Sequence, residues 1–254
     1  MGMTRRRGLV AGVRALAARR HGPVVEAAIG VGALLAYNLA KARTGGSIDE
    51  GIRNARRIVA LEKRLGVFVE PAMQRLVLRG TWSRRIWGTA YLSSQLVVLP
   101  LTLRLAYRRL PHAYPAIRTL AIIAWSGGVA WYARQPVAPP RMVPGIGIED
   151  SVSDGVIPMD HPIVRLVYHP VAAMPSLHVG MAPVVAWTIW SATTRPSLRA
   201  AAVAYPLAVA TTVVVTGNHF LADIAGGLAI VAPAAAAARW ISRAPGIPGT
   251  PEDA

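Results

Sequence analysis

A histidine and an aspartate near the end of the chain are the first residues whose spacing suggests chemistry. His219 and Asp223 are four positions apart in an apolar stretch, so on a helix their side chains share a face and can touch. An aspartate that accepts one imidazole N–H fixes the tautomer and leaves the other ring nitrogen as a nucleophile or base. The pattern also recurs by chance, so a hydrogen-bonded structural histidine explains it as well.

A second cluster, MPSLH at residues 174–178, stands at the start of another apolar stretch. Pro175 suits the first turn of a helix, and Ser176 can cap that helix where free backbone N–H groups favour an anion. A proline and a serine are also an ordinary start for a membrane helix. That alternative does not explain His178.

The third cluster, RQPVAPPR at residues 134–141, places two arginines on either side of a proline-rich segment. Guanidinium groups pair well with phosphate oxygens, which makes Arg134 and Arg141 candidate phosphate-binding residues. Alternatively, the arginines anchor the end of a membrane helix at the lipid headgroups, and this fits Arg134 well.

The elements that must position these residues are apolar helices. A transmembrane helix needs about 20 mostly apolar residues, and six stretches come close. Six of them in one short chain argue against buried helices of a soluble core, so we expect an all-α, polytopic membrane protein with about six transmembrane helices. The stretches are residues 24–40, 86–103, 113–133, 171–194, 200–222 and 220–238.

Six spans place both termini on one side of the membrane and all three clusters on the other. Lys and Arg divide evenly between the sides, so the positive-inside rule does not orient the chain. Most of those on the cluster side lie in residues 41–85, where surface helices can hold them at the interface, and we therefore expect the termini inside. Residues 48–65 predict an amphipathic helix that lies on the lipid or packs on the bundle. Its stripe is Ile52, Ala55, Val59 and Glu62.

The composition supports a membrane protein. Hydrophobic residues make up 53% and charged residues only 16%, against about a quarter in soluble chains. A net charge of +16 suits an anionic membrane surface, and the basic residues lack the interleaved aromatics of a nucleic-acid platform. The absence of cysteine excludes disulfides and thiolate catalysis. We expect one membrane domain at 23–242, a basic cytoplasmic tail at 1–22 and a disordered tail at 243–254.

In order along the chain, the three clusters resemble the motifs of the type 2 phosphatidic acid phosphatase superfamily. The tracts PVAPPRMVPG, AAMPSLHVG and TGNHFLADIAGG look most like its inositolphosphotransferase branch, which includes inositol phosphorylceramide synthases. The resemblance spans about residues 24–240. It implies a multi-pass enzyme of the cell membrane that acts on a lipid phosphate at the extracytoplasmic face. It also implies no metal or other cofactor and no nucleic acid as a partner.

The resemblance also implies roles in a two-step phosphoryl transfer. His219, oriented by Asp223, would attack phosphorus to form a phosphohistidine, and His178 would protonate the leaving oxygen. The intermediate would then pass to water or to an alcohol. Phosphoryl transfer depends mainly on positioning and on stabilising charge, which suits cationic and polar groups. Those implied to hold the phosphate oxygens are Arg134, Arg141 and Ser176.

The chain departs from the superfamily pattern at three positions. Arg134 replaces the usual opening lysine of the first motif, and Met142 replaces a proline. Val213 stands where the third motif usually has an arginine six residues before its histidine. One phosphate-binding cation is therefore missing, for which Arg141 or Arg165 could compensate. Either the substrate is a diester rather than a highly charged monoester, which favours transfer over hydrolysis, or activity is reduced.

Three other functions fit parts of the sequence. The first is simple hydrolysis of a lipid monophosphate. The second is a non-catalytic transporter or scaffold with a decayed site, consistent with Val213. The third is a metal hydrolase with a two-histidine, one-carboxylate site at His178, His219 and Asp223, although the motifs offer no further acidic ligand.

Overall fold

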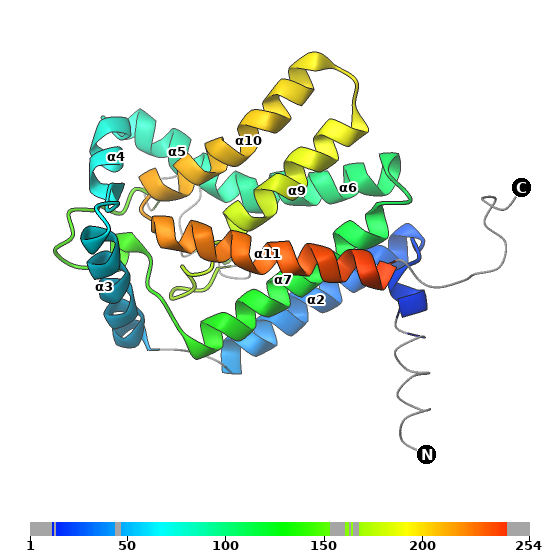
Figure 1. Ribbon diagram of the computed structural model, residues 1–254, viewed down its shortest axis with the longest axis horizontal. Helices are drawn as coiled ribbons and strands as arrows, with labels where there is room; N and C mark the ends of the chain where they lie inside the picture. The colour runs from blue at the N-terminus through cyan, green and yellow to red at the C-terminus, as the bar shows by residue number, and fades with distance from the viewer. Residues whose placement is uncertain are drawn as a thin grey trace, which may run out of the picture.

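The computed structural model describes residues 12, 14–43, 47–152, 161, 162, 164 and 168–242, and the regular structure within them is helical. Figure 1 shows long helices packed side by side, with shorter ones at one end. The elements are α2 (Pro23–Arg43), α3 (Ile48–Arg64), α4 (Glu70–Val77), α5 (Thr81–Ser93), the π-helical turn η1 (Ser94–Val98), α6 (Leu99–Arg109), α7 (Tyr114–Arg134), the 3-10 turn η2 (Pro140–Met142), α9 (Leu177–Ala192), α10 (Pro196–Val215) and α11 (Leu221–Ser242).

The predicted all-α membrane class is confirmed. Four helical segments of the described chain are long and apolar enough to cross a membrane, namely α2, Thr81–Arg109, α10 and α11. Helix α9 is apolar but has only 16 residues, and α7 with 21 residues covers the remaining predicted stretch. Each of the six predicted stretches therefore contains a helix, and four meet the criteria for a span.

Two predicted boundaries were wrong. The stretch 171–194 begins too early, because residues 171–176 are not helical and α9 starts only after Pro175. The stretch 200–222 runs too far, because α10 ends at Val215. Gly217 there has a φ of 68°, in the left-handed region that commonly ends helices. Residues 216–220 therefore belong to neither α10 nor α11.

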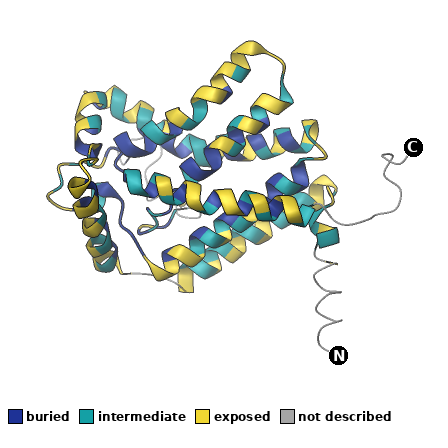
Figure 2. Ribbon diagram, viewed as in Figure 1, coloured by how far each residue is buried: buried dark blue, intermediate teal, exposed yellow. Residues whose placement is uncertain are grey.

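Helix α11 contacts α7 and α9, and α9 also packs along α10 (Figure 1). Gly180 of α9 and Gly227 of α11 allow the close approach: a Cβ on Gly180 would lie 2.7 Å from the Gly227 carbonyl oxygen. Figure 2 shows buried positions along the facing sides of the helices and exposed positions outside. The outward positions include large apolar side chains, as expected for helices whose solvent is lipid: Leu35, Leu101, Leu207 and Trp240.

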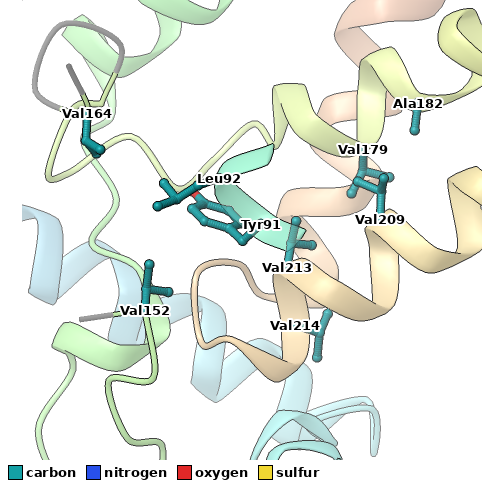
Figure 3. Packing of buried hydrophobic residues seen from close by; sticks show 9 residues of the cluster. All are labelled: Tyr91, Leu92, Val152, Val164, Val179, Ala182, Val209, Val213 and Val214. Carbon is teal, nitrogen blue, oxygen red and sulfur yellow. The ribbon is translucent and has the colours of Figure 1, made fainter. Parts of the chain in front are cut away.

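An apolar cluster joins α5, α9 and α10 close to the predicted catalytic residues. Figure 3 shows the ring of Tyr91 beside Val213 at the end of α10. Tyr91, Val179 and Val213 are buried members of one cluster. The beginning of α9 and the end of α10 are therefore fixed relative to each other by packing.

The predicted amphipathic helix is α3. Ser47 caps it by accepting a hydrogen bond from the Glu50 N–H at 3.1 Å. Its buried face packs on the bundle, as one of the two predicted placements has it, because that face contacts residues of the interhelical loops. Ala55 and Val59 form a cluster with Val137, Ala138, Val171 and Phe220.

The proline-rich connector between α7 and α9 is mainly irregular where it is described. Val137 donates to the Val171 carbonyl at 2.8 Å, and the Ala173 N–H donates to the Val137 carbonyl at 3.0 Å. These bonds hold the two ends of the connector together. The predicted tail at 243–254 lies outside the described residues, and in the N-terminal segment the Arg14 guanidinium lies 4.2 Å from the Trp240 ring centroid.

Candidate active site

The three sequence clusters meet at one end of the bundle. They come from the end of α7 and its connector, the start of α9, and the turn before α11, which Figure 1 shows at the opposite end from the start of α2. The ring centroids of His178 and His219 are 5.8 Å apart. The structure thus brings together both predicted catalytic histidines.

His219 is buried and has two oxygen atoms near the same ring nitrogen. Its Nδ1 lies 2.7 Å from the Ala173 carbonyl oxygen and 3.4 Å from Asp223 Oδ2. Two acceptors at Nδ1 favour the tautomer that carries its proton there, which leaves Nε2 as the nucleophilic nitrogen. Asp223 Oδ2 also accepts the Phe220 N–H at 2.8 Å, so the carboxylate holds both the imidazole and the chain beside it.

The turn before His219 is fixed by its backbone. The N–H groups of Asn218 and His219 donate to the Val213 carbonyl at 3.0 and 3.1 Å. At Gly217 a Cβ would lie 2.8 Å from Ile148 Cγ2, so both its positive φ and its surroundings require glycine. Val213, the position of the missing arginine, is completely buried and contributes its carbonyl to this turn.

His178 and Ser176 lie at the start of α9. The His178 ring stacks on Tyr91, with centroids 4.5 Å apart and 23° between the planes. The Ser176 N–H donates to the Asp223 carbonyl at 2.9 Å, which ties α9 to the first turn of α11. Ser176 Oγ is buried without a hydrogen-bond partner among the described residues. A free hydroxyl at a helix N-terminus suits a phosphate oxygen.

The two predicted phosphate-binding arginines are placed differently. Arg141 donates from Nε to Asn218 Oδ1 at 3.1 Å, and its Nη1 lies 3.2 Å from Asp150 Oδ2. Arg134 is exposed and donates to the Ala130 carbonyl of its own helix at 3.1 Å. The structure therefore brings Arg141, but not Arg134, to the residues around His219. Arg165 lies outside the described residues.

A cavity of about 80 Å³ adjoins the two histidines, and aromatic side chains line much of it. Sequence reasoning missed Asn218, although its position directly before His219 is a signal that could have identified it. No such signal exists for the aromatic residues, which are common in membrane helices. In the connector, burial and then the charge of Lys41 lower the pKa of His169, which keeps this lining residue neutral. The lining includes Tyr37, Tyr91, Trp125, Tyr132, Tyr168, His169, His178, Asn218 and His219.

Among the described residues, no group of three or more His, Asp or Glu side chains has the arrangement of a metal site. The two-histidine, one-carboxylate alternative thus has no assembled ligand set in this part of the chain.

The family follows from a comparison of the chain with known families. A family model described as the PAP2 superfamily matches residues 56–237, a range that includes all three clusters. The chain belongs to the PAP2 superfamily. No curated protein and no solved structure matches it.

Membership in the PAP2 superfamily makes the protein a membrane enzyme of the lipid-phosphatase type, with a lipid phosphate as substrate. The predicted superfamily is thereby confirmed. Assignment to the inositolphosphotransferase branch stays a prediction, as do the roles of the individual site residues.

Proposed function

We propose that this PAP2 protein is a phosphotransferase that acts on a lipid phosphate of the inositolphosphotransferase type through a phosphohistidine on His219. The supporting observation is the environment of the His219 ring. Nδ1 faces the Ala173 carbonyl and Asp223, while the ring lines the cavity beside His178. An imidazole held through one nitrogen presents the other for attack.

In the first step, His219 Nε2 forms a bond to phosphorus and the bond from phosphorus to the leaving alkoxide breaks. His178 donates a proton to that oxygen, and Ser176 and Arg141 hold phosphate oxygens. In the second step, an alcohol gives its proton back to His178 and attacks phosphorus, which releases His219. With water as acceptor, the same steps give hydrolysis.

The charge of the site favours a diester substrate. Arg141 already lies beside Asp150, Arg134 is exposed on α7, and the buried Val213 supplies no cation. A phosphate monoester carries nearly two negative charges near pH 7 and a diester one. The lower positive charge around His219 therefore suits a diester donor and transfer to an alcohol.

Trapping of the phosphoenzyme tests the proposal. Purified protein in detergent, given phosphatidylinositol labelled at its phosphate, is expected to acquire label that survives base and is lost in acid, as phosphohistidine does. His219→Ala should abolish the label, while His112→Ala should keep it, because His112 is an exposed histidine outside the cavity. Labelling that persists in folded His219→Ala would remove this residue from the role of nucleophile.

Product analysis separates transfer from hydrolysis. Wild-type protein with labelled phosphatidylinositol and a ceramide acceptor is expected to release diacylglycerol and give a new labelled phosphodiester. Release of inositol phosphate alone, together with faster turnover of phosphatidic acid, would establish the simple phosphatase instead.

A further inference from the structure

Two buried glutamates from distant parts of the chain hold the first turn of α11. The Ala222 N–H donates to Glu62 Oε1 at 2.8 Å, and the Leu221 N–H donates to Glu70 Oε1 at 3.0 Å. Helices begin with backbone N–H groups that lack partners within the helix, and these are usually satisfied by a nearby capping residue. Here the acceptors come from α3 and α4, 160 and 151 residues away along the chain.

Both carboxyl groups are removed from water, since Glu62 is 2% exposed and Glu70 is 0% exposed. Their second oxygens, Oε2 in each case, are buried without a hydrogen-bond partner among the described residues. Two ionised carboxylates only accept hydrogen bonds. A single proton between them would satisfy both free oxygens and remove one buried charge.

The surroundings of Glu62 favour such a proton. Burial is the main cause that raises the pKa of Glu62 to about 8, against the lowering effect of the Ala222 N–H, and Glu70 and Asp223 raise it further. The titratable groups facing Glu62 are thus both acidic and come from α4 and α11. The neighbouring basic residues of α3, Lys63 and Arg64, are exposed.

The held turn carries the catalytic pair. His219 precedes α11 by two residues and Asp223 lies in its first turn. Between them, the Phe220 N–H is bonded to Asp223, and the Asp223 carbonyl receives the Ser176 N–H. A shift of Leu221 or Ala222 would therefore displace His219, Asp223 and the start of α9 together.

We propose that Glu62 and Glu70 are positioning residues for the phosphoryl transfer: sharing one proton, they hold the first turn of α11 and so fix His219 against Asp223. This rests on the proposed function of His219. The pair lies outside the three sequence clusters, and its hydrogen bonds to α11 run to backbone N–H groups rather than to the His219 ring.

Two variants of Glu62 distinguish the loss of its charge from the loss of its hydrogen bonds. Glu62→Gln keeps an oxygen for the Ala222 N–H and an N–H₂ group for Glu70, so kcat is expected to stay within about threefold of wild type. Glu62→Leu leaves the backbone N–H unsatisfied and the turn free to shift. Misplacement by about 1 Å can cost about 100-fold, so we expect kcat to fall by about 10- to 100-fold with KM little changed. Asp49→Leu, an exposed acidic position in the same helix, serves as the control and should match wild type.

The pH profile gives a readout that a merely structural contact would not move. Above about pH 8 the wild-type pair loses its proton, because that is where the pKa of Glu62 lies. The additional buried charge then repels Glu70 and Asp223, and kcat is expected to decline. Glu62→Gln has no proton to lose there, so its alkaline limb should move to higher pH.

The proton on Glu62 should also make the stability of the protein depend on pH. Folded Glu62 keeps it up to about pH 8, whereas the ordinary pKa of the group is 4.5. The folded state binds more protons between these values, so wild-type stability should fall as the pH rises through this window. Glu62→Gln should remove that part of the slope.

The outcomes distinguish this proposal from the proposed function. All variants are assayed with labelled phosphatidylinositol in detergent, and folding is checked by size-exclusion chromatography and helical circular dichroism. A wild type that turns over without a phosphoenzyme overturns the role of His219. A wild type with a phosphoenzyme, combined with an unshifted pH profile in Glu62→Gln, overturns the role of the glutamates. If Glu62→Leu does not fold, the profile of Glu62→Gln alone decides.

Discussion

At the scale of single residues, the structure separates two arginines that the sequence treats alike. Arg141 is hydrogen-bonded to Asn218, the residue before His219, whereas Arg134 is bonded to its own exposed helix end. Removing one preorganised donor from a transition state costs about 100- to 1000-fold in rate. We expect Arg141→Ala to lower kcat/KM by about 100-fold and Arg134→Ala by less than about threefold.

The comparison is made by steady-state kinetics on the two purified variants, normalised to folded protein. Arg134→Ala is the matched control, since it removes the same charge at the same end of the bundle. Equal losses in the two variants would show that long-range charge, and not the contact of Arg141 with the site, determines activity.

Which site residues could be predicted depends on how far apart in the chain their partners are. His219 and Asp223 were visible as a pair because their spacing matches one helical turn. His178 and Ser176 were visible because they begin an apolar stretch. Glu62 was visible only as part of an amphipathic stripe, because its partner Ala222 is 160 residues away. No local pattern reports such a contact.

At the scale of elements, the crossing of α9 and α11 sets the distance between the two histidines. A Cβ on Gly227 would lie 2.1 Å from the Ser176 carbonyl oxygen, which is backbone and cannot rotate away. We expect Gly227→Ala to push the start of α9 from α11 and destabilise the protein by about 1–3 kcal/mol, the usual cost of overpacking. Activity should fall as well, since Ser176 and His178 move with α9.

Thermal unfolding in detergent and turnover measure the two effects. Gly32→Ala is the control, because α2 has nothing within 4 Å of a Cβ at that position. If Gly227→Ala unfolds at the wild-type temperature with wild-type activity, the close contact of the two helices does not position the site.

Helix ends were harder to predict than helices. The amphipathic period identified α3, and hydropathy identified the apolar helices, because both signals repeat along the chain. The ends of α9 and α10 depend instead on single contacts. Val213 accepts the N–H groups of two residues in the turn, and Ser176 bonds to Asp223 across the helix interface. Because of these contacts, His219 and Ser176 lie just outside the regular helices.

At the scale of the whole molecule, the sequence predicted most clearly that the helices are surrounded by lipid. The high apolar content predicted a membrane protein, and the structure leaves large apolar side chains such as Leu207 and Trp240 on its outer surface. Parity then predicted that all three clusters share one end, although the charge count did not orient that end. The number and order of the helices decide that the three clusters meet at one end of the bundle. Which side of the membrane that end faces depends on how the chain is inserted, which the helices alone do not decide.

Sidedness can be tested without background labelling, because the chain contains no cysteine. Ala60→Cys lies on the exposed, arginine-rich face of α3 at the site end, and Ser197→Cys lies at the exposed start of α10 at the other end. With the termini inside, Ala60→Cys should react with a membrane-impermeant thiol reagent in intact cells. Ser197→Cys should react only after the cells are opened.

Permeabilised cells, in which both positions should react, control for accessibility. The reverse pattern in intact cells would place His219 and the cavity at the cytoplasmic face, so that the acceptor alcohol would have to come from the inner leaflet. The expected pattern instead supplies donor and acceptor lipids from the outer leaflet. The basic residues of α3 and α4 would then lie at the external lipid headgroups, which is why counting them with the loops leaves the charge rule undecided.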